Sequence, residues 1–282
     1  MTNIRRYREA HSLTQAEMGK RLGITRAQYS NIESRASGLT MERLQEIANI
    51  FDLSAEKLLQ QPEAKVVSFV NRKGGVGKST MTALFSTAFA CWTTKRVLVI
   101  DADSQATVAN MAEEGKASAM ALTSFNFDES HTPIRDFLKL VERKSKEYDL
   151  IFIDTQGSFS DGQATNTILS ISDVCVIPIQ ATKPAVQSTL TTLISLPEIA
   201  ASRREEGQSF LPLGIINQKT RTNEHKIVKD LDGQFGMKVL ENALSNLVRY
   251  HREVSLSKPI CQPQDDDEFA HLFKELSEII GL

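Results

Sequence analysis

The stretch Asn71-Arg72-Lys73-Gly74-Gly75-Val76-Gly77-Lys78-Ser79-Thr80 follows the apolar run Val66-Val67-Ser68-Phe69-Val70. This order predicts a strand, a glycine-rich turn and the start of a helix, which together are typical of a phosphate-binding loop. Glycine allows the backbone to wrap closely enough around a polyphosphate for several N–H groups to converge on it. The Lys78 ammonium can then contact the terminal phosphates, and the Ser79 hydroxyl is suited to ligate magnesium.

The loop departs from the pattern GxxxxGK[ST], because Arg72 stands at the first glycine position and Lys73 adds a second lysine. In this it resembles the deviant Walker A motif of the ParA/MinD family of ATPases. The resemblance implies the cofactors ATP and Mg²⁺, and a homodimer that sandwiches ATP, in which Lys73 reaches the partner's phosphates. Lys78 and Ser79 would contact the phosphates and magnesium of their own chain. The expected nucleotide-binding residues of the loop are Lys73, Gly74, Gly75, Val76, Gly77, Lys78, Ser79 and Thr80.

The chain after the loop alternates helical segments with short apolar runs at 97–100, 150–153, 174–178 and 213–216. Continuous apolar runs are typical of parallel strands that are covered on both faces. The pattern therefore predicts an α/β fold, a doubly wound and mostly parallel sheet whose ligands bind at the carboxyl ends of the strands. Residues 104–132 are hard to interpret: they form either a nucleotide-responsive switch or a variable connection.

Polar residues stand where three of these runs end. Asp101 and Asp103 follow the first run and resemble the family's Walker A′ motif, with Ser104 in place of the usual proline. By resemblance Asp103 positions the attacking water and belongs with Lys73 and Lys78 in catalysis, and Asp101 is associated with magnesium. Asp154 matches a Walker B carboxylate, which would hold magnesium directly or through water. Asn217 either lies near the nucleotide base or serves an ordinary turn.

The first sixty residues predict a separate, small all-α domain. Thr14 to Glu17 and Thr25 to Gln28 both fit the capping box that begins a helix, and Gly23 provides a turn between the two helices. This arrangement is a helix-turn-helix. The residues expected to pack inward are Leu13, Met18, Leu22, Ile24, Tyr29, Ile32, Leu44, Ile47, Ala48 and Phe51.

This segment resembles the Cro/repressor-like (XRE) helix-turn-helix family, including Leu13-Thr14-Gln15 and the pair Ile32-Glu33. The resemblance makes residues 25–35 the recognition helix. Arginine pairs with guanine, and asparagine or glutamine with adenine, each through two hydrogen bonds, and Gln15 is placed to bond a phosphate. A helical bundle that contacts only proteins remains an alternative. The expected DNA-contacting residues of this segment are Gln15, Thr25, Arg26, Ala27, Gln28 and Asn31.

Composition and charge limit the function classes. The chain has 282 residues, 41% of them hydrophobic, and a net charge of −2. Residues 1–62 carry nine Lys and Arg against seven Asp and Glu, so this part is mildly basic. Three widely spaced cysteines indicate neither a disulfide framework nor a zinc site. No apolar segment approaches the length that crosses a bilayer, so we expect a cytoplasmic protein. The resemblance to the ParA family implies that it associates with the nucleoid. The domains predicted are 1–60, a linker at 61–65, and 66–282.

A series of basic residues follows residue 217, and Arg249 and Arg252 are spaced by about one helical turn. Such charges are usually only a solvated helix face. Acidic residues lie elsewhere in the sequence, at 265–268, and partition ATPases of the ParA family bind nonspecific DNA through C-terminal basic residues. By that resemblance Arg249 and Arg252 are expected to contact DNA phosphates. The last helix is acidic, which opposes attachment to anionic lipid.

Together these features predict an ATP-dependent DNA partition ATPase, with slow magnesium-dependent hydrolysis that a ParB-like centromere-binding protein stimulates. The N-terminal domain would bind an operator and regulate the protein's own synthesis. Two alternatives remain: a transcriptional regulator whose oligomeric state is set by nucleotide, and a ParA-like positioning ATPase for a protein cargo.

Overall fold

The computed structural model describes residues 3–11, 13–34, 39–55, 58, 63–111, 118–157, 162–219, 225–246, 249–252 and 254–281. The chain divides into two compact units, Met1–Glu63 and Ala64–Leu282. The linker at 61–65 stays a prediction, because residues 61 and 62 lie outside the described part of the chain.

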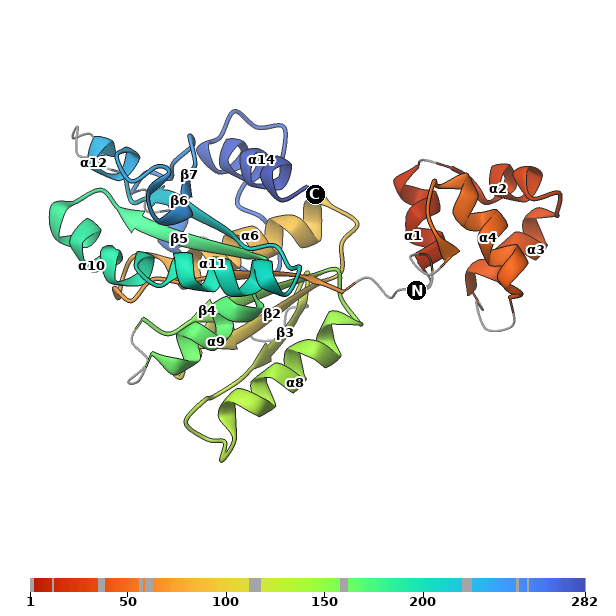
Figure 1. Cartoon of the computed structure of the whole chain (residues 1–282). Coiled ribbons are helices and arrows are strands. Elements are labelled where there is room, and N and C mark those ends of the chain that lie inside the picture. Colours follow the sequence, from red (N-terminus) through yellow and green to blue (C-terminus); the bar gives the residue numbers. More distant parts are fainter. Residues whose placement is uncertain are drawn as a thin grey trace. The chain divides into compact units, whose positions relative to one another are not determined.

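The first unit consists of short helices around a small apolar core. Its helices are α1 (Asn3–Ala10), α2 (Gln15–Arg21), α3 (Arg26–Ser34) and α4 (Met41–Ile50) (Figure 1). Thr14 begins α2 through a complete capping box with Glu17. Thr25 and Gln28 exchange the same two bonds before α3. All ten residues predicted to pack inward belong to the core or pack against it.

The second unit is built on a seven-stranded sheet of order β3-β2-β4-β1-β5-β6-β7, in which every pair of neighbours is parallel. The strands are β1 (Lys65–Phe69), β2 (Val97–Ala102), β3 (Ala121–Ser124), β4 (Leu150–Thr155), β5 (Val174–Gln180), β6 (Leu211–Asn217) and β7 (Lys238–Val239). The predicted doubly wound α/β fold is confirmed. The chain order reverses beside β1, and such a point is where ligands bind in sheets of this kind.

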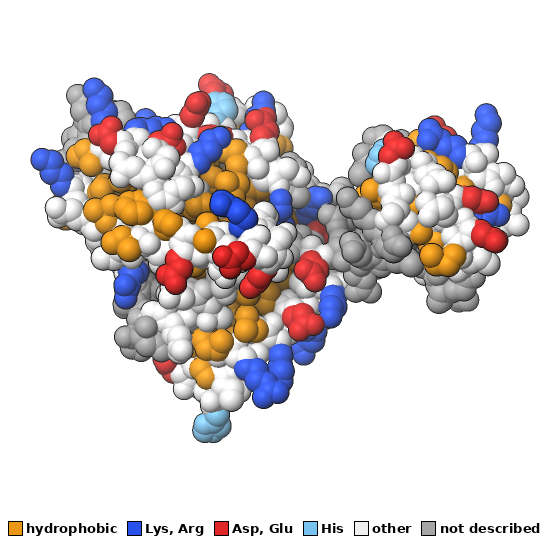
Figure 2. Space-filling view, viewed as in Figure 1, with side chains coloured by type: hydrophobic (Ala, Val, Ile, Leu, Met, Phe, Trp, Pro, Cys, Tyr) orange, Lys and Arg blue, Asp and Glu red, His pale blue; other side chains and the backbone are white. Residues whose placement is uncertain are grey.

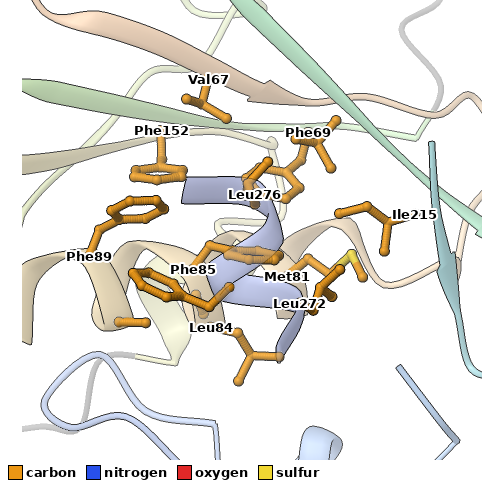
Figure 3. Packing of buried hydrophobic residues seen from close by; sticks show 14 of the residues in the cluster. Val67, Phe69, Met81, Leu84, Phe85, Phe89, Phe152, Ile215, Leu272 and Leu276 are labelled. Carbon is orange, nitrogen blue, oxygen red and sulfur yellow. The ribbon is translucent and has the colours of Figure 1, made fainter. Parts of the chain in front are cut away.

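Helices cover both faces of the sheet (Figure 1). On one face α6 (Lys78–Trp92) and α14 (Glu268–Ile280) pack against the side chains of Val67, Phe69 and Phe152, as Figure 3 shows. The opposite face carries α8 (Pro133–Ser145), α9 (Gln163–Ile171), α10 (Lys183–Leu193) and α11 (Leu196–Glu205). Short helices α7 (Thr107–Asn110), α12 (His225–Lys229) and α13 (Arg249–Arg252), and a 3₁₀ turn at Gln234–Gly236, complete the described elements.

The stretch that was hard to interpret, 104–132, contains α7 and the edge strand β3, and residues 112–117 of it lie outside the described part. None of the helices that the structure describes has the length and apolar content needed to span a bilayer.

We expect Phe152→Ala to lower the free energy of unfolding of the second unit by about 3–5 kcal/mol, because the cavity left in a packed core cannot fully collapse. Phe152 is fully buried between Phe69 and Phe89, with ring centroids at 6.1 and 5.7 Å. Trp92, the one tryptophan of the chain, packs against Phe273 in this unit. Its fluorescence during urea unfolding therefore reports this unit selectively.

The matched control is Ile194→Ala, because 65% of the Ile194 side chain is exposed. We expect this variant to change the free energy of unfolding by less than about 0.5 kcal/mol. Equal losses in the two variants would contradict the packing described.

Candidate nucleotide-binding site

The glycine-rich loop leaves β1 and enters α6 through residues in the left-handed region. Gly75 has φ +73° and Gly77 has φ +92°, values that side chains disfavour. A Cβ atom on Gly77 would also lie 2.2 Å from Nδ2 of Asn217. Asn217 ends β6 and donates from Nδ2 to the carbonyl oxygen of Val76 at 2.7 Å. In this structure Asn217 thus supports the loop itself, and its contact with a nucleotide base stays a prediction.

A cavity of about 460 Å³ opens over the loop and the amino end of α6. Backbone N–H groups at a helix start attract anions, so the cavity is suited to a polyphosphate. Its lining residues are Arg72, Gly74, Gly75, Gly77, Lys78, Ser79, Thr80, Asp103, Gln105, Thr107, Met111, Gln156, Gly157 and Gln218.

Lys78 and Asp154 are two buried ionisable residues of the site. Lys78 is 7% exposed, and its Nζ lies 3.5 Å from the carbonyl oxygen of Lys73. Burial lowers the pKa of the Lys78 ammonium, whereas the Asp154 and Asp103 carboxylates act to raise it. The ammonium is therefore held where it can exchange its present partners for phosphate oxygens.

Asp154 is fully buried at the end of β4. Burial raises its pKa to about 7, and the hydrogen bond from Ser79 opposes this shift. Thr82 Oγ1 lies 3.1 Å from Asp154 Oδ1, whereas Oδ2 has no hydrogen-bond partner among the described residues. A buried carboxylate oxygen without a partner, beside a serine hydroxyl, is a suitable donor set for magnesium. The Ser79 and Asp154 side chains fit such an ion.

Thr82 was missed by the sequence analysis. The signal that could have found it is its position four residues after Lys78, which puts both side chains on one face of α6.

Asp101 lies level with Asp154 on the neighbouring strand β2. Its Oδ1 accepts a bond from the Asp103 backbone N–H at 3.2 Å, and Oδ2 accepts one from Ala109 at 2.8 Å. Burial raises the pKa of Asp101, and these backbone bonds oppose the shift. Asp101 thus holds the turn after β2, and Asp154 is the better placed of the two carboxylates for a cation.

Asp103 begins that turn, directly after β2, and lines the cavity, half-buried. Its Oδ1 accepts a bond from the backbone N–H of Gln105 at 2.9 Å. One carboxylate oxygen is thereby fixed at the cavity wall, a position from which a carboxylate can orient water.

Lys73 lies at the rim of the loop, half-buried. Its Nζ donates to Oε1 of Gln180, the last residue of β5, at 3.1 Å. Its backbone N–H donates to the side chain of Asn71 at 2.9 Å. Asn71 is buried and also donates to the carbonyl oxygen of Pro178. The sequence analysis missed Asn71 and Gln180, because their partners lie far apart in the chain.

In the first unit, Arg26, Ala27 and Asn31 are exposed on α3. Gln28 is also exposed, but its Oε1 accepts bonds from the backbone N–H and Oγ1 of Thr25 at 2.8 and 3.1 Å. The capping box therefore occupies the amide oxygen that adenine recognition would use.

Gln15 donates from Nε2 to Oε2 of Glu33 at 2.9 Å, and Glu33 also pairs with Arg8 inside the bundle. These bonds fix the start of α2 against α3. They explain the Ile32-Glu33 pair as part of the packing between the helices, and they constrain the orientation in which Gln15 would meet a phosphate.

The sequence analysis expected the basic and acidic residues of this region to lie apart, and at Arg249 this expectation is wrong. Its guanidinium pairs with Asp267, bonds Tyr250 Oη at 2.9 Å and lies 4.8 Å from the centre of the Tyr250 ring. The side chain of Arg252 lies outside the described part of the chain. Acidic and basic side chains are interspersed on the face seen in Figure 2. Any DNA contact of Arg249 therefore competes with Asp267.

Comparison with known protein families gives two matches. Residues 4–58 match a helix-turn-helix family, and residues 67–260 match the CobQ/CobB/MinD/ParA nucleotide binding domain. The chain is 32% identical over 116 residues to the maintenance of carboxysome distribution protein A of Gloeobacter kilaueensis. That match spans 40% of this chain and 48% of the relative, so the chain spans about half the length of that protein.

Solved structures support the same fold. An ATP complex of Cyanothece McdA has a TM-score of 0.56 at 16% identity, with 78% of this chain and 97% of that chain covered. A plasmid partition protein of Borrelia burgdorferi bound to AMPPNP has a TM-score of 0.54 at 21% identity, with 77% and 98% covered. Cobyrinic acid a,c-diamide synthase of Mycobacterium smegmatis, with ADP and magnesium, has a TM-score of 0.57 at 16% identity, with 77% and 94% covered.

The raised pKa of Asp154 predicts how stability depends on pH. The carboxyl group has a pKa of 3.8 in model compounds and about 7 in the folded chain, so the folded chain holds the proton more tightly than the unfolded chain does. The contribution of the Asp154 proton to the free energy of unfolding is complete below about pH 4, and it is lost as the pH rises through about 7. Without magnesium, we expect the free energy of unfolding to fall over this range, by up to about 1.4 kcal/mol per pH unit.

Urea unfolding followed by Trp92 fluorescence, in EDTA at several pH values, measures this slope. Asp154→Asn should flatten it, because the amide does not titrate. Identical slopes in the two proteins would show that Asp154 is not the titrating group.

Proposed function

The chain belongs to the CobQ/CobB/MinD/ParA nucleotide-binding family of ATPases, and from this premise we propose that it is an ATP-dependent DNA partition ATPase. The observation that carries the proposal is that two lysines of the loop lie in different environments. Lys78 is buried beside Asp154, whereas Lys73 is held at the rim of the same loop. A second ammonium at the rim supports contact with a phosphate on another protomer.

The residues of the loop bind and orient the nucleotide. Backbone N–H groups of residues 74–80 receive the phosphates, and Lys78 neutralises their charge. Ser79 and Asp154 would hold magnesium, with Asp101 fixing the adjacent turn. When bound, magnesium supplies positive charge to the phosphate oxygens. Asp103 orients the attacking water at the cavity wall.

Two ATP-bound protomers form the sandwich homodimer, in which each Lys73 reaches the phosphates of the partner. Hydrolysis separates the protomers, which makes nucleotide a switch between two states. A ParB-like centromere-binding protein stimulates this slow step. The dimer binds nonspecific DNA through Arg252 and through Arg249 released from Asp267, and this binding associates the protein with the nucleoid.

Residues 1–60 read an operator. The match of residues 4–58 to a helix-turn-helix family supports DNA binding by this unit. Arg26 and Asn31 are exposed on α3 and are the residues we assign to base edges, with Ala27 on the same surface. Thr25, Gln15 and Gln28 lie at the helix starts, where backbone and side-chain groups meet phosphates.

The test of the sandwich is Lys73→Ala. In sedimentation velocity with ATP and magnesium, we expect the wild type to dimerise and Lys73→Ala to need at least about tenfold more protein, because a charged hydrogen bond to phosphate is lost from each half of the interface. Lys78→Ala is the matched control and should lose ATP binding itself. A Lys73→Ala protein that dimerises as the wild type does would remove the sandwich model.

The test of the two DNA modes compares binding to the gene's own upstream duplex and to a scrambled duplex, each with ADP and with ATP and magnesium. We expect Arg26→Ala to weaken binding to the upstream duplex by about 1–3 kcal/mol while the ATP-dependent binding to scrambled DNA persists. Binding to the upstream duplex alone, with no ATP-dependent nonspecific mode, would point to a regulator tuned by nucleotide.

A second candidate is the positioning of a protein cargo. It is favoured by the similarity to the maintenance of carboxysome distribution protein A. The positioning of a protein cargo requires no operator. Equal affinity for the upstream and scrambled duplexes in ADP would favour this candidate over partition with self-regulation.

A further inference from the structure

Three interactions meet on the side chain of Gln180 at the carboxyl end of β5. Its Oε1 accepts the bond from Lys73 Nζ at 3.1 Å. Its Nε2 donates to the carbonyl oxygen of Gly75 at 3.1 Å and to Oε1 of Gln218 at 2.5 Å. The amide thus joins the rim lysine to the phosphate loop and to the residue that follows β6. The Gln180 side chain is half-buried, so water competes only partly for these bonds.

The second residue of this group is set in an unusual conformation. Gln218 has φ +53°, in the left-handed region that is rare for residues other than glycine. Its own Nε2 lies 3.4 Å from the same Gly75 carbonyl oxygen. Both glutamines therefore approach one loop carbonyl, but of the two only Gln180 also bonds the Lys73 ammonium in the described part of the chain. This difference makes it possible to separate support of the loop from restraint of the lysine.

The bond between Lys73 and Gln180 is suited to release. A neutral amide oxygen binds an ammonium group more weakly than a phosphate oxygen does, because the phosphate carries formal charge. An ammonium held in this way stays ordered in the single protomer and moves to a phosphate when one arrives. The restraint weakens dimerisation, because the apparent affinity between protomers is reduced in proportion to the fraction of time that the Lys73 ammonium is free.

We propose that Gln180 is a positioning residue that holds Lys73 within its own protomer and thereby sets the protein concentration at which the ATP-bound chain dimerises. The proposal rests on the proposed function, in which Lys73 reaches the partner's phosphates. Gln180 itself needs no contact with the nucleotide in this role. It acts through Lys73, so its effect belongs to the association of protomers and not to the binding of ATP by one protomer.

The test compares two substitutions that change the restraint in opposite directions. Gln180→Ala removes the acceptor of Lys73, and Gln180→Glu replaces it with a carboxylate, which binds an ammonium more strongly. Dimerisation is measured by sedimentation velocity over a range of protein concentrations with ATP and magnesium. The affinity of the single protomer for a fluorescent ATP analogue is measured separately at low protein concentration.

We expect Gln180→Ala to lower the dimerisation midpoint by about threefold to tenfold and Gln180→Glu to raise it by at least as much, once each is corrected for its own ATP affinity. The matched control is Gln218→Ala, which removes the partner of the Gln180 Nε2 atom and leaves the Lys73 contact in place. Gln218 lines the nucleotide cavity, so this control is corrected for its own ATP affinity in the same way. It should not lower the midpoint.

If Gln180 only supports the loop, both of its substitutions will weaken dimerisation, and Gln218→Ala will resemble them. That result, or an unchanged midpoint in Gln180→Ala, overturns the proposal. Failure of the proposed function has a different signature: the wild type does not dimerise with ATP, or Lys73→Ala dimerises as the wild type does. In a third outcome the wild type dimerises through Lys73, but Gln180→Ala has the same midpoint as the wild type. This outcome leaves the sandwich model intact and contradicts only the restraint by Gln180.

Discussion

The buried carboxylate of Asp154 is the constraint on which the site depends. It lies at the end of β4, beside Lys78 at the start of α6, with no water-exposed surface. A charge in such a place is costly unless it is compensated, and the raised pKa of Asp154 expresses this cost. Helix α6 must therefore start where Lys78 and Ser79 reach Asp154, and the loop before it must turn within a few residues. The left-handed Gly77 provides that turn, and the amide of Asn217 occupies the space that a Cβ atom would need.

The same constraint explains how charge is distributed around the cavity. Two carboxylates, Asp101 and Asp154, lie level on adjacent strands, an arrangement that repels unless one is neutralised. Backbone N–H groups satisfy Asp101, whereas Asp154 keeps an oxygen without a partner among the described residues. Neutralisation of Asp154 is thus left to a proton, to Lys78 or to a bound cation. A proton or Lys78 can neutralise Asp154 in the absence of a ligand, and a magnesium ion can do so when it binds with the nucleotide.

The sequence predicted those features that depend on local pattern. Central strands such as β2 and β4 are continuous apolar runs ended by Asp101 and Asp154, so both the strands and the position of their carboxylates could be inferred. The edge strands β3 and β7 escaped notice, because an edge strand is short and only partly buried. Contacts between distant segments were also missed. Gln180 meets residues 107 positions before it and 38 after it, and no periodicity in one segment reports such a meeting.

Acidic residues of α14 support the nucleotide site indirectly, through the segment that follows β7. Glu275 accepts bonds from the backbone N–H groups of residues 241 and 242, and Glu268 accepts them from Ser245. The segment held in this way exchanges backbone bonds with the end of β6, through Leu244 to Ile216 and Lys219 to Leu244. That strand end carries Asn217, which bonds the loop at Val76. Acidic side chains of α14 therefore help to fix the residue that supports the phosphate loop, and because they accept backbone N–H bonds, their charge is part of the fold and not an indication of a free acidic surface.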